Sequence, residues 1–312
     1  MNSIRVLVTD KCNAECSNCI NKVIRTESCF MDLPRFKVLA QYFHDNNVCR
    51  IRIMGGEPTI HPNFRQIVEF SQTMFSRVTI FTNGLNSNLL EFSPRESDSI
   101  NYNARFARII PKEHFMSDKQ GSRILSIVIY RQLNTYEMIC TIAKINEYVQ
   151  NLKVSLTFDC TINIFKYRSV LLDKFNILYD FCILHQIEVI IDHGLPVCFL
   201  YRSKVPSCKG FSICSERCAG LIDANFNLRF CNQISSDTFA LFEGGKIKPF
   251  KLLNNWLKFI FYQKQVTVLS KICVECPFYG NICNGGCYIH KDFINREDIL
   301  QYTELPVIVK NN

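Results

Sequence analysis

Strand-like and helix-like segments alternate through the first two thirds of this 312-residue chain. The apolar, β-rich runs typical of strands are residues 4–9, 50–54, 77–82, 99–106, 124–130, 153–158 and 189–192. The amphipathic helical patterns are residues 34–44, 63–75, 136–149 and 169–185. Strands joined by crossover helices run parallel, so this order predicts an α/β fold whose parallel sheet is open or curled into a partial barrel.

The chain contains 17 cysteines. Whether they form disulfides or bind metal depends on whether the cellular compartment is oxidising or reducing. The N-terminus, Met1 to Arg5, lacks the long apolar stretch of a secretory signal, and no run of 18 uncharged apolar residues occurs. We therefore expect a cytoplasmic protein without a membrane span, whose clustered thiols bind metal. The net charge of +8 is spread along the chain, so it allows an acidic partner without requiring nucleic acid.

Three cysteines, Cys12, Cys16 and Cys19, follow the first predicted strand directly. Thiolates at this spacing can hold one iron–sulfur cube and leave its fourth iron without a protein ligand. A structural zinc site needs four ligands, and the next candidates, Cys29 and His44, lie too far along the chain for finger-like spacing. The alternative is a set of three core cysteines at the end of a strand.

The loop resembles the C-x3-C-x2-C motif of the radical S-adenosylmethionine (radical SAM) superfamily. Two later segments are similar to further motifs of that family, in the family's order: Gly55-Gly56-Glu57-Pro58 after the second strand, and Thr82-Asn83-Gly84 after the third. The resemblance implies that the first of these segments contacts the methionyl amino group of S-adenosylmethionine. Glycines permit close backbone approach, and the Glu57 carboxylate could accept hydrogen bonds from an ammonium.

The same resemblance implies that the ribose contact comes from the ends of the next strands, where Asn101, Asn103 and Ser126 are candidates. Asn18 stands where many members have an aromatic residue, which leaves adenine packing at that position open. Four other side chains are candidates to face the substrate from strand ends, namely Tyr102, Tyr130, Asp159 and Asp192. For His61 and His193 we expect surface or hydrogen-bonded loop positions. No catalytic acid or base is assigned.

Cysteines cluster again near the C-terminus, at Cys208, Cys214, Cys218, Cys231, Cys273, Cys276, Cys283 and Cys287. The last four resemble the C-x2-C-x5-C-x3-C signature of SPASM and twitch extensions, with six residues here between Cys276 and Cys283. Cys218 and Cys231 resemble the earlier, hairpin-borne pair of these extensions. No cysteine follows Cys287, where the full extension takes its last ligand.

The extension implies one or two auxiliary 4Fe-4S clusters. One cluster would draw on Cys218, Cys231, Cys273 and Cys276, and Cys283 and Cys287 would serve a second cluster or displace some of these ligands. A zinc ribbon is the alternative for this region, because its Cys pairs could supply four thiolates to one ion.

The resemblance implies a partial (β/α)6 TIM-like barrel over residues 1–195 and a small cysteine-rich α+β domain over residues 196–312. It also implies a radical SAM oxidoreductase that cleaves S-adenosylmethionine reductively and abstracts a substrate hydrogen through a 5′-deoxyadenosyl radical. We expect the product to be an oxidised or crosslinked peptide or protein side chain. Two other functions stay open: a dehydrogenase or epimerase of a small molecule such as an amino sugar, and a non-catalytic iron–sulfur electron carrier or zinc-binding module.

The expected partners follow from that chemistry. They are a peptide or small-molecule substrate and an electron donor such as flavodoxin or ferredoxin. Because the first strand starts near residue 4, recognition of a peptide leader would need a separate leader-binding protein or the extension itself.

Overall fold

A single curved sheet forms the centre of the molecule. The computed structural model describes residues 2–17, 19–21, 29–115, 120–159, 162–191, 199, 220–231 and 238–267. Its ten-stranded sheet has the order β10-β9-β8-β1-β2-β3-β4-β5-β6-β7, and all pairs from β1 to β7 are parallel. These seven strands are β1 (Ser3–Leu7), β2 (Arg50–Met54), β3 (Arg77–Thr82), β4 (Ser99–Asn103), β5 (Ser122–Ile129), β6 (Leu152–Phe158) and β7 (Glu188–Ile191). The prediction of an α/β fold with a curled parallel sheet is confirmed.

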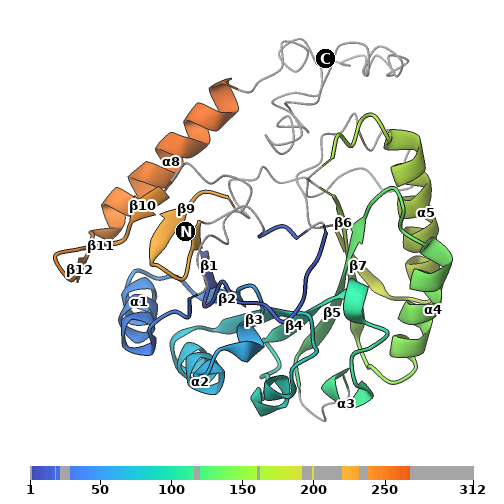
Figure 1. Ribbon diagram of the computed structural model, residues 1–312, viewed down its shortest axis with the longest axis horizontal. Coiled ribbons are helices and arrows are strands. Elements are labelled where there is room, and N and C mark those ends of the chain that lie inside the picture. Colours follow the sequence, from blue (N-terminus) through green and yellow to red (C-terminus); the bar gives the residue numbers. More distant parts are fainter. Residues whose placement is uncertain are drawn as a thin grey trace, which may run out of the picture.

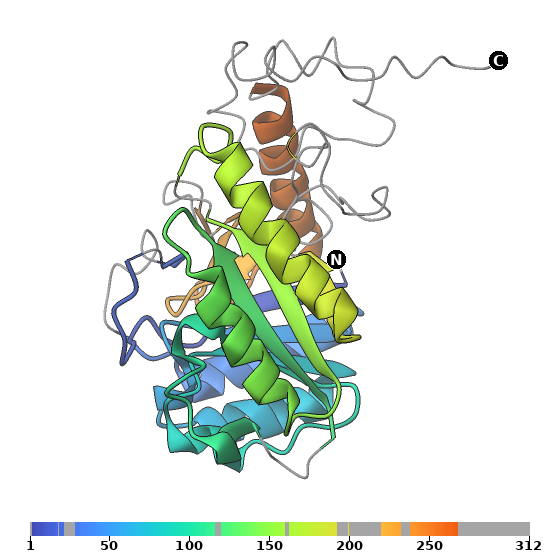
Figure 2. The ribbon, with the colours of Figure 1, turned by 90° about the vertical axis from the view of Figure 1, so that its right-hand side faces the viewer.

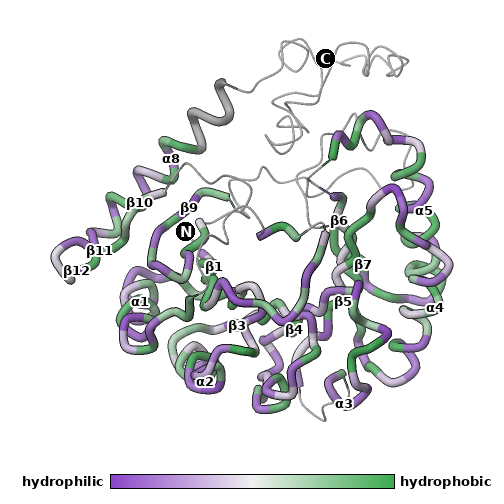
Figure 3. Tube along the Cα trace, in the orientation of Figure 1, coloured by the Kyte–Doolittle hydropathy of each residue, from purple (hydrophilic) through white to green (hydrophobic). Residues whose placement is uncertain are grey.

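The helices cover the outer, convex side of this sheet (Figure 1). They are α1 (Leu33–Asp45), α2 (Phe64–Met74), α3 (Lys112–Phe115), α4 (Thr135–Asn146) and α5 (Arg168–Leu184). Figure 2 shows α4 and α5 side by side over β5 to β7, and Figure 3 shows hydrophobic and hydrophilic residues alternating along the outer helices. Their apolar faces, which include Phe36, Phe64 and Phe175, pack on strand residues such as Ile53 and Val78 in one continuous core.

The sequence places the end of β4 three residues too late and does not predict the short helical turns. Residues 104–106, predicted as strand, form the 3-10 helix η3 (Ala104–Phe106). The cause is Asn103, whose side-chain oxygen accepts a hydrogen bond from the Arg105 amide at 3.1 Å and so starts the turn. The connection from β3 to β4 carries a second 3-10 helix, η2 (Ser87–Glu91), and the 55–58 segment leads into a third, η1 (Pro58–Ile60).

The hairpin expected in the cysteine-rich part joins the barrel sheet directly. Strand β8 (Leu221–Ile222) pairs in parallel with β1, and it turns back into β9 (Asn227–Arg229). The remaining elements are β10 (Thr238–Ala240), β11 (Phe242–Glu243), β12 (Lys246–Ile247) and α8 (Phe250–Thr267). The predicted boundary near residue 195 falls outside the described residues and stays a prediction. Within the described ranges, no helix is long and apolar enough to cross a membrane.

Asp223 organises the turn of this hairpin. Its buried carboxylate accepts hydrogen bonds from the amides of Asn225 and Asn227 and from Nε of Arg229, at 3.1, 2.9 and 2.8 Å. Phe226 lies in the left-handed region with φ of 62°, which is unusual for a bulky residue. Its ring packs edge-on against Phe242 at 5.4 Å, so burial of the side chain offsets the backbone cost.

We expect Asp223→Ala to lower the free energy of unfolding by about 3 kcal/mol or more, because it leaves the Arg229 charge buried and opens the turn. Urea denaturation measures the change. Glu69→Ala is the matched control, since it breaks the Arg65–Glu69 ion pair, whose side chains are 65% and 56% exposed. An Asp223→Ala midpoint equal to that of the control would contradict this account.

Candidate functional site

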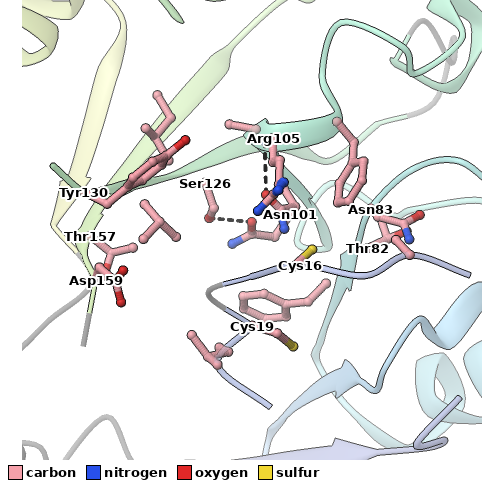
Figure 4. A pocket seen from close by; sticks show the side chains of 18 of the residues that line it. Cys16, Cys19, Thr82, Asn83, Asn101, Arg105, Ser126, Tyr130, Thr157 and Asp159 are labelled. Carbon is pink, nitrogen blue, oxygen red and sulfur yellow. Dashed lines mark hydrogen bonds between the residues drawn. The ribbon is translucent and has the colours of Figure 1, made fainter. Parts of the chain in front are cut away.

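A cavity of about 430 Å³ opens at the carboxyl ends of the parallel strands. One side is formed by the cysteine loop, the 54–57 segment and the end of β3, and the other by the ends of β5 and β6 and the start of α4. Figure 4 shows Cys16, Cys19, Thr82 and Asn83 across the cavity from Tyr130, Thr157 and Asp159. The parallel strands therefore bring segments more than 100 residues apart in the sequence to one site.

Cys12, Cys16 and Cys19 all line this cavity, and each is only partly buried. Among the residues described, no three His, Cys, Asp or Glu side chains converge closely enough to bind one metal ion. In an iron–sulfur cube each thiolate binds a different iron, so its ligands stand farther apart than those of a single zinc. Three part-exposed thiols on one wall therefore fit a cluster as donor set.

Three side-chain hydrogen bonds fix the cysteine loop between and beside its thiols. Asn83 Nδ2 donates to Asn13 Oδ1 at 2.7 Å, and Arg105 Nη1 donates to Ser17 Oγ at 3.2 Å. Asn21, which is buried, donates from Nδ2 to the Gly55 carbonyl at 2.8 Å. Sequence reasoning missed Asn21 and Arg105, because their partners lie 34 and 88 residues away and no local spacing reveals them.

The two glycines let the 55–57 segment pair with the chain's own backbone beyond β1. The amide of Gly56 donates to the Thr9 carbonyl, and that of Glu57 donates to the Lys11 carbonyl, both at 2.8 Å. A Cβ on Gly56 would lie 2.1 Å from the Lys11 oxygen, so no other residue fits there. Glycine at position 56 is thus needed so that the backbone of this segment can lie against the backbone of residues 9–11.

Glu57 braces the end of β2 against the end of β3. Its side chain is 1% exposed and accepts four hydrogen bonds. Oε1 takes them from the Thr59 amide, Thr59 Oγ1 and Thr82 Oγ1 at 3.1, 2.6 and 2.7 Å, and Oε2 from the Asn83 amide at 2.7 Å. Burial raises the pKa of the Glu57 carboxyl, while the four donated bonds act in the opposite direction. Its expected role toward a ligand ammonium stays a prediction.

Asn101 and Ser126 come together on adjacent strands, as cavity-lining residues of β4 and β5. Ser126 Oγ donates to Asn101 Oδ1 at 2.6 Å, so Asn101 is the acceptor of this pair through its side-chain oxygen. Asn103 also lines the cavity. The ribose contact assigned to these residues stays a prediction.

Tyr102 does not face the cavity, so its place among the substrate-facing candidates is wrong. The side chain is fully buried and its hydroxyl donates to the His114 carbonyl at 2.6 Å; burial raises its pKa. Alternate residues of a strand point to opposite faces, and Tyr102 shares with Ile100 the face that packs on the helices. Tyr130 and Asp159 do line the cavity.

His61 is buried in a hydrogen-bonded position, as expected. Its ring accepts from the Asn63 amide at Nδ1 and bonds the Met31 carbonyl through Nε2, both at 3.0 Å. Pro58, at the start of η1, is also buried and is not among the residues that line the cavity.

Only Cys231 of the predicted auxiliary ligands lies within the described residues. It is buried, 8% exposed, beside Phe230 and Ile260. Cys218, Cys273, Cys276, Cys283 and Cys287 lie outside the described residues, as do Asn18, Asp192, His193, Cys208 and Cys214.

No family model matches the chain. Part of it is 31% identical over 77 residues to the antilisterial bacteriocin subtilosin biosynthesis protein AlbA of Bacillus subtilis, covering 25% of this chain and 17% of AlbA. Part of it is 37% identical over 86 residues to the GTP 3',8-cyclase of Haemophilus ducreyi, covering 26% of this chain and 25% of the cyclase. These matches therefore span a quarter or less of each relative.

Two solved structures share most of the fold. Streptococcus suis SuiB bound to its precursor peptide SuiA covers 92% of this chain and 72% of SuiB, with a TM-score of 0.64 and 16% identity. Native anSMEcpe with bound AdoMet and Cp18Cys peptide covers 96% of both chains, with a TM-score of 0.55 and 14% identity. Together with AlbA, these neighbours confirm the resemblance to radical SAM enzymes.

We expect Glu57→Gln to lower the free energy of unfolding by about 1–3 kcal/mol, because the new amide nitrogen faces a buried donor. Thermal or urea unfolding measures the loss. Glu91→Gln, on an exposed side chain at the end of η2, is the control and should unfold like the wild type. If both variants unfold at the same denaturant concentration, the four hydrogen bonds to Glu57 do not hold the ends of β2 and β3 together.

Proposed function

We propose that this chain is a radical SAM enzyme whose Cys12, Cys16 and Cys19 hold a 4Fe-4S cluster with an open iron. The observation that carries the proposal is that these three part-exposed thiols line the same cavity as Gly55, Gly56 and the carboxyl ends of β3 to β6. A non-catalytic electron carrier does not need a second wall of polar strand ends facing its thiols.

A reduced cluster held by Cys12, Cys16 and Cys19 would supply the electron for reductive cleavage of S-adenosylmethionine to methionine and a 5′-deoxyadenosyl radical, and that radical would take a hydrogen atom from the substrate. The protein's part is to bind and orient. Gly55 and Gly56 offer backbone groups beside the thiols, and the Asn101 amide offers a donor to a ribose hydroxyl. Phe81, Phe106 and Val128 add apolar cavity wall, which keeps water and stray hydrogen donors from the radical.

We propose a peptide or protein side chain as the substrate. The support is that SuiB and anSMEcpe, which share the fold, are seen with peptides, and that AlbA is a bacteriocin biosynthesis protein. A small-molecule substrate is the second candidate, because GTP 3',8-cyclases recur among the sequence relatives. The rate of 5′-deoxyadenosine formation with added peptide, compared with added GTP, separates the two.

The proposal includes a cysteine-rich extension over residues 196–312 that binds one or two auxiliary clusters. Its support is the cysteine spacing and the attachment of β8 to β1. Cys218, Cys231, Cys273, Cys276, Cys283 and Cys287 are the proposed ligands. A cytoplasmic location, a flavodoxin or ferredoxin as electron donor and a separate leader-binding protein belong to the same proposal.

We expect the anaerobically reconstituted full chain to form 5′-deoxyadenosine from S-adenosylmethionine after dithionite reduction, as detected by chromatography. Cys12→Ala, Cys16→Ala and Cys19→Ala should each abolish product, because each removes a cluster ligand. Cys140→Ala, which removes an exposed thiol on α4 far from this loop in sequence, is the control and should retain activity. A wild-type chain that holds its cluster yet forms no product with or without added peptide or GTP would overturn the catalytic proposal.

Iron analysis tests the extension separately. With an auxiliary cluster we expect about eight or more irons per chain, and Cys231→Ala should lower that number without affecting the first cluster. About four irons together with bound zinc would instead favour the zinc ribbon and contradict the auxiliary cluster.

A further inference from the structure

His114 is a buried imidazole outside the cavity that bonds to a segment of the cavity wall. The side chain belongs to α3 and is 6% exposed. Its Nδ1 lies 2.6 Å from the carbonyl oxygen of Gly84. A carbonyl oxygen only accepts hydrogen bonds, so Nδ1 carries the hydrogen and donates it. A helix 30 residues further along the chain thus holds the end of the 82–84 segment, whose Thr82 and Asn83 line the cavity (Figure 4).

Gly84 lies directly against buried side chains of the segment that leads to α3. Its φ is +75°, a conformation that residues with a side chain rarely adopt. A Cβ at this position would lie 2.7 Å from Cδ1 of Ile110 and 3.1 Å from Cδ1 of Tyr102. Glycine is therefore required for the turn after β3 to come within reach of the His114 ring.

His114 is itself held in place from β4. The Tyr102 hydroxyl donates to the His114 carbonyl at 2.6 Å, and the Tyr102 ring lies 4.5 Å from the ring of Phe115. Tyr102 is also the register partner of Thr82 in the pairing of β3 with β4. The tyrosine that does not face the cavity thus fixes the imidazole relative to the end of β3.

On the cavity side, the same turn reaches the cysteine loop through Asn83. The Asn83 backbone amide donates to Glu57 Oε2, and its side-chain oxygen accepts a hydrogen bond from the Leu85 amide at 3.0 Å. Because the Leu85 bond holds the oxygen of the side-chain amide, the nitrogen is the group that faces Asn13, at 2.7 Å from its Oδ1. Asn13 directly follows the first thiol of the loop, Cys12. Asn83 therefore links the turn to the cysteine loop.

We infer that His114 is a positioning residue for the cysteine loop. Its Nδ1–H holds the Gly84 carbonyl, and the turn fixed in this way directs the Asn83 side chain at Asn13. His114 is not among the residues that line the cavity, so it acts through Asn83 and not on a ligand. The inference rests on the proposed function, because the loop that His114 positions is the proposed cluster site.

Amide hydrogen exchange of the full chain without iron, followed by mass spectrometry, tests the first step. The amides of Asn83, Gly84 and Leu85 are all hydrogen-bonded, so a peptide that spans residues 83–85 reports on the turn. His114→Leu removes the donor, and should speed exchange of this peptide about three- to tenfold. His114→Asn should keep the wild-type rate, because the asparagine amide nitrogen stands as many bonds from Cα as Nδ1 does. His114→Gln, which places this nitrogen farther from the backbone, should resemble His114→Leu.

Phe115→Leu is the matched control for lost packing in α3. Phe115 is 2% exposed, and its substitution weakens the same helix without removing the Nδ1 donor, so exchange at residues 83–85 should stay within about twofold of the wild type. Tyr102→Phe removes only the hydroxyl that holds the His114 carbonyl, and should speed exchange about threefold. It tests the same contacts if His114→Leu does not fold.

Three exchange results would overturn the inference. The first is wild-type exchange in both His114→Leu and Tyr102→Phe. The second is an equal increase in His114→Leu and Phe115→Leu, and the third is an equal increase in His114→Leu and His114→Asn. The last two would mean that the ring only fills space.

Release of iron to a chelator from the reconstituted full chain tests the second step, because the rate depends on how firmly the cysteine loop holds its cluster. His114→Leu and Asn13→Ala should each speed release about fivefold. The double variant should release iron no faster than either single variant, since His114 acts through the bond to Asn13. Effects that multiply to about 25-fold, or a wild-type rate in His114→Leu, would overturn the inference.

The exchange measurement needs neither iron nor S-adenosylmethionine, so the two proposals fail separately. Cleavage of S-adenosylmethionine by the wild type, with wild-type exchange and iron release in His114→Leu, leaves the proposed function standing and removes His114 from the site. Faster exchange in His114→Leu, in a chain that binds no cluster, leaves the hydrogen-bonded turn standing and removes the cluster site that the proposed function assigns to the loop.

Discussion

The backbone pairing of residues 9–11 with residues 56–57 holds the cysteine loop against the end of β2. Two backbone hydrogen bonds of 2.8 Å, from Gly56 to Thr9 and from Glu57 to Lys11, join the two segments beyond the ends of β1 and β2, at a separation that only glycine at position 56 permits. The cysteine loop begins directly after this pairing. The Glu57 carboxylate then links the paired segment to the end of β3, because it accepts hydrogen bonds from Thr82 and Asn83. The thiols, the backbone of the 55–57 segment and the end of β3 are thus parts of one rigid construction rather than three independent loops.

The 55–57 segment has to meet two requirements at once, and different groups meet each of them. A ligand-binding segment must expose backbone groups, and it must also stay in place when the ligand leaves. The Glu57 carboxylate keeps the segment in place without a ligand, because all four of its hydrogen-bond donors are protein groups. Asn21 and Arg105 tie the far parts of the cysteine loop to Gly55 and to η3. The site therefore holds its shape through side chains that need not touch a ligand at all.

The sequence predicts the elements well because their periodicity is a local property. The spacing of residues within a short segment reveals strands, amphipathic helices and the motifs at strand ends. What cannot be predicted is pairing across long separations: the bond from Arg105 to Ser17 spans 88 residues. The assignment of Tyr102 fails for a related reason, because the face on which a residue lies depends on a register that its own sequence does not reveal. The turn at Asn103 is missed because one side-chain hydrogen bond outweighs the β propensity of its neighbours.

The parallel pairing of β8 with β1 decides how the two cysteine-rich parts of the chain lie relative to each other. Arg5 and Val6 lie beside Leu221 and Ile222, so the strand that enters the first cysteine loop and the hairpin that ends at Cys231 are neighbours in one sheet. The Cys29 thiol also lies 3.7 Å from Asn225 Oδ1 in the hairpin turn. Strand neighbours keep a spacing of about 4.8 Å whatever the length of chain between them. The separation between the strand that enters the first cysteine loop and the hairpin that ends at Cys231 is therefore set by the pairing of β1 with β8.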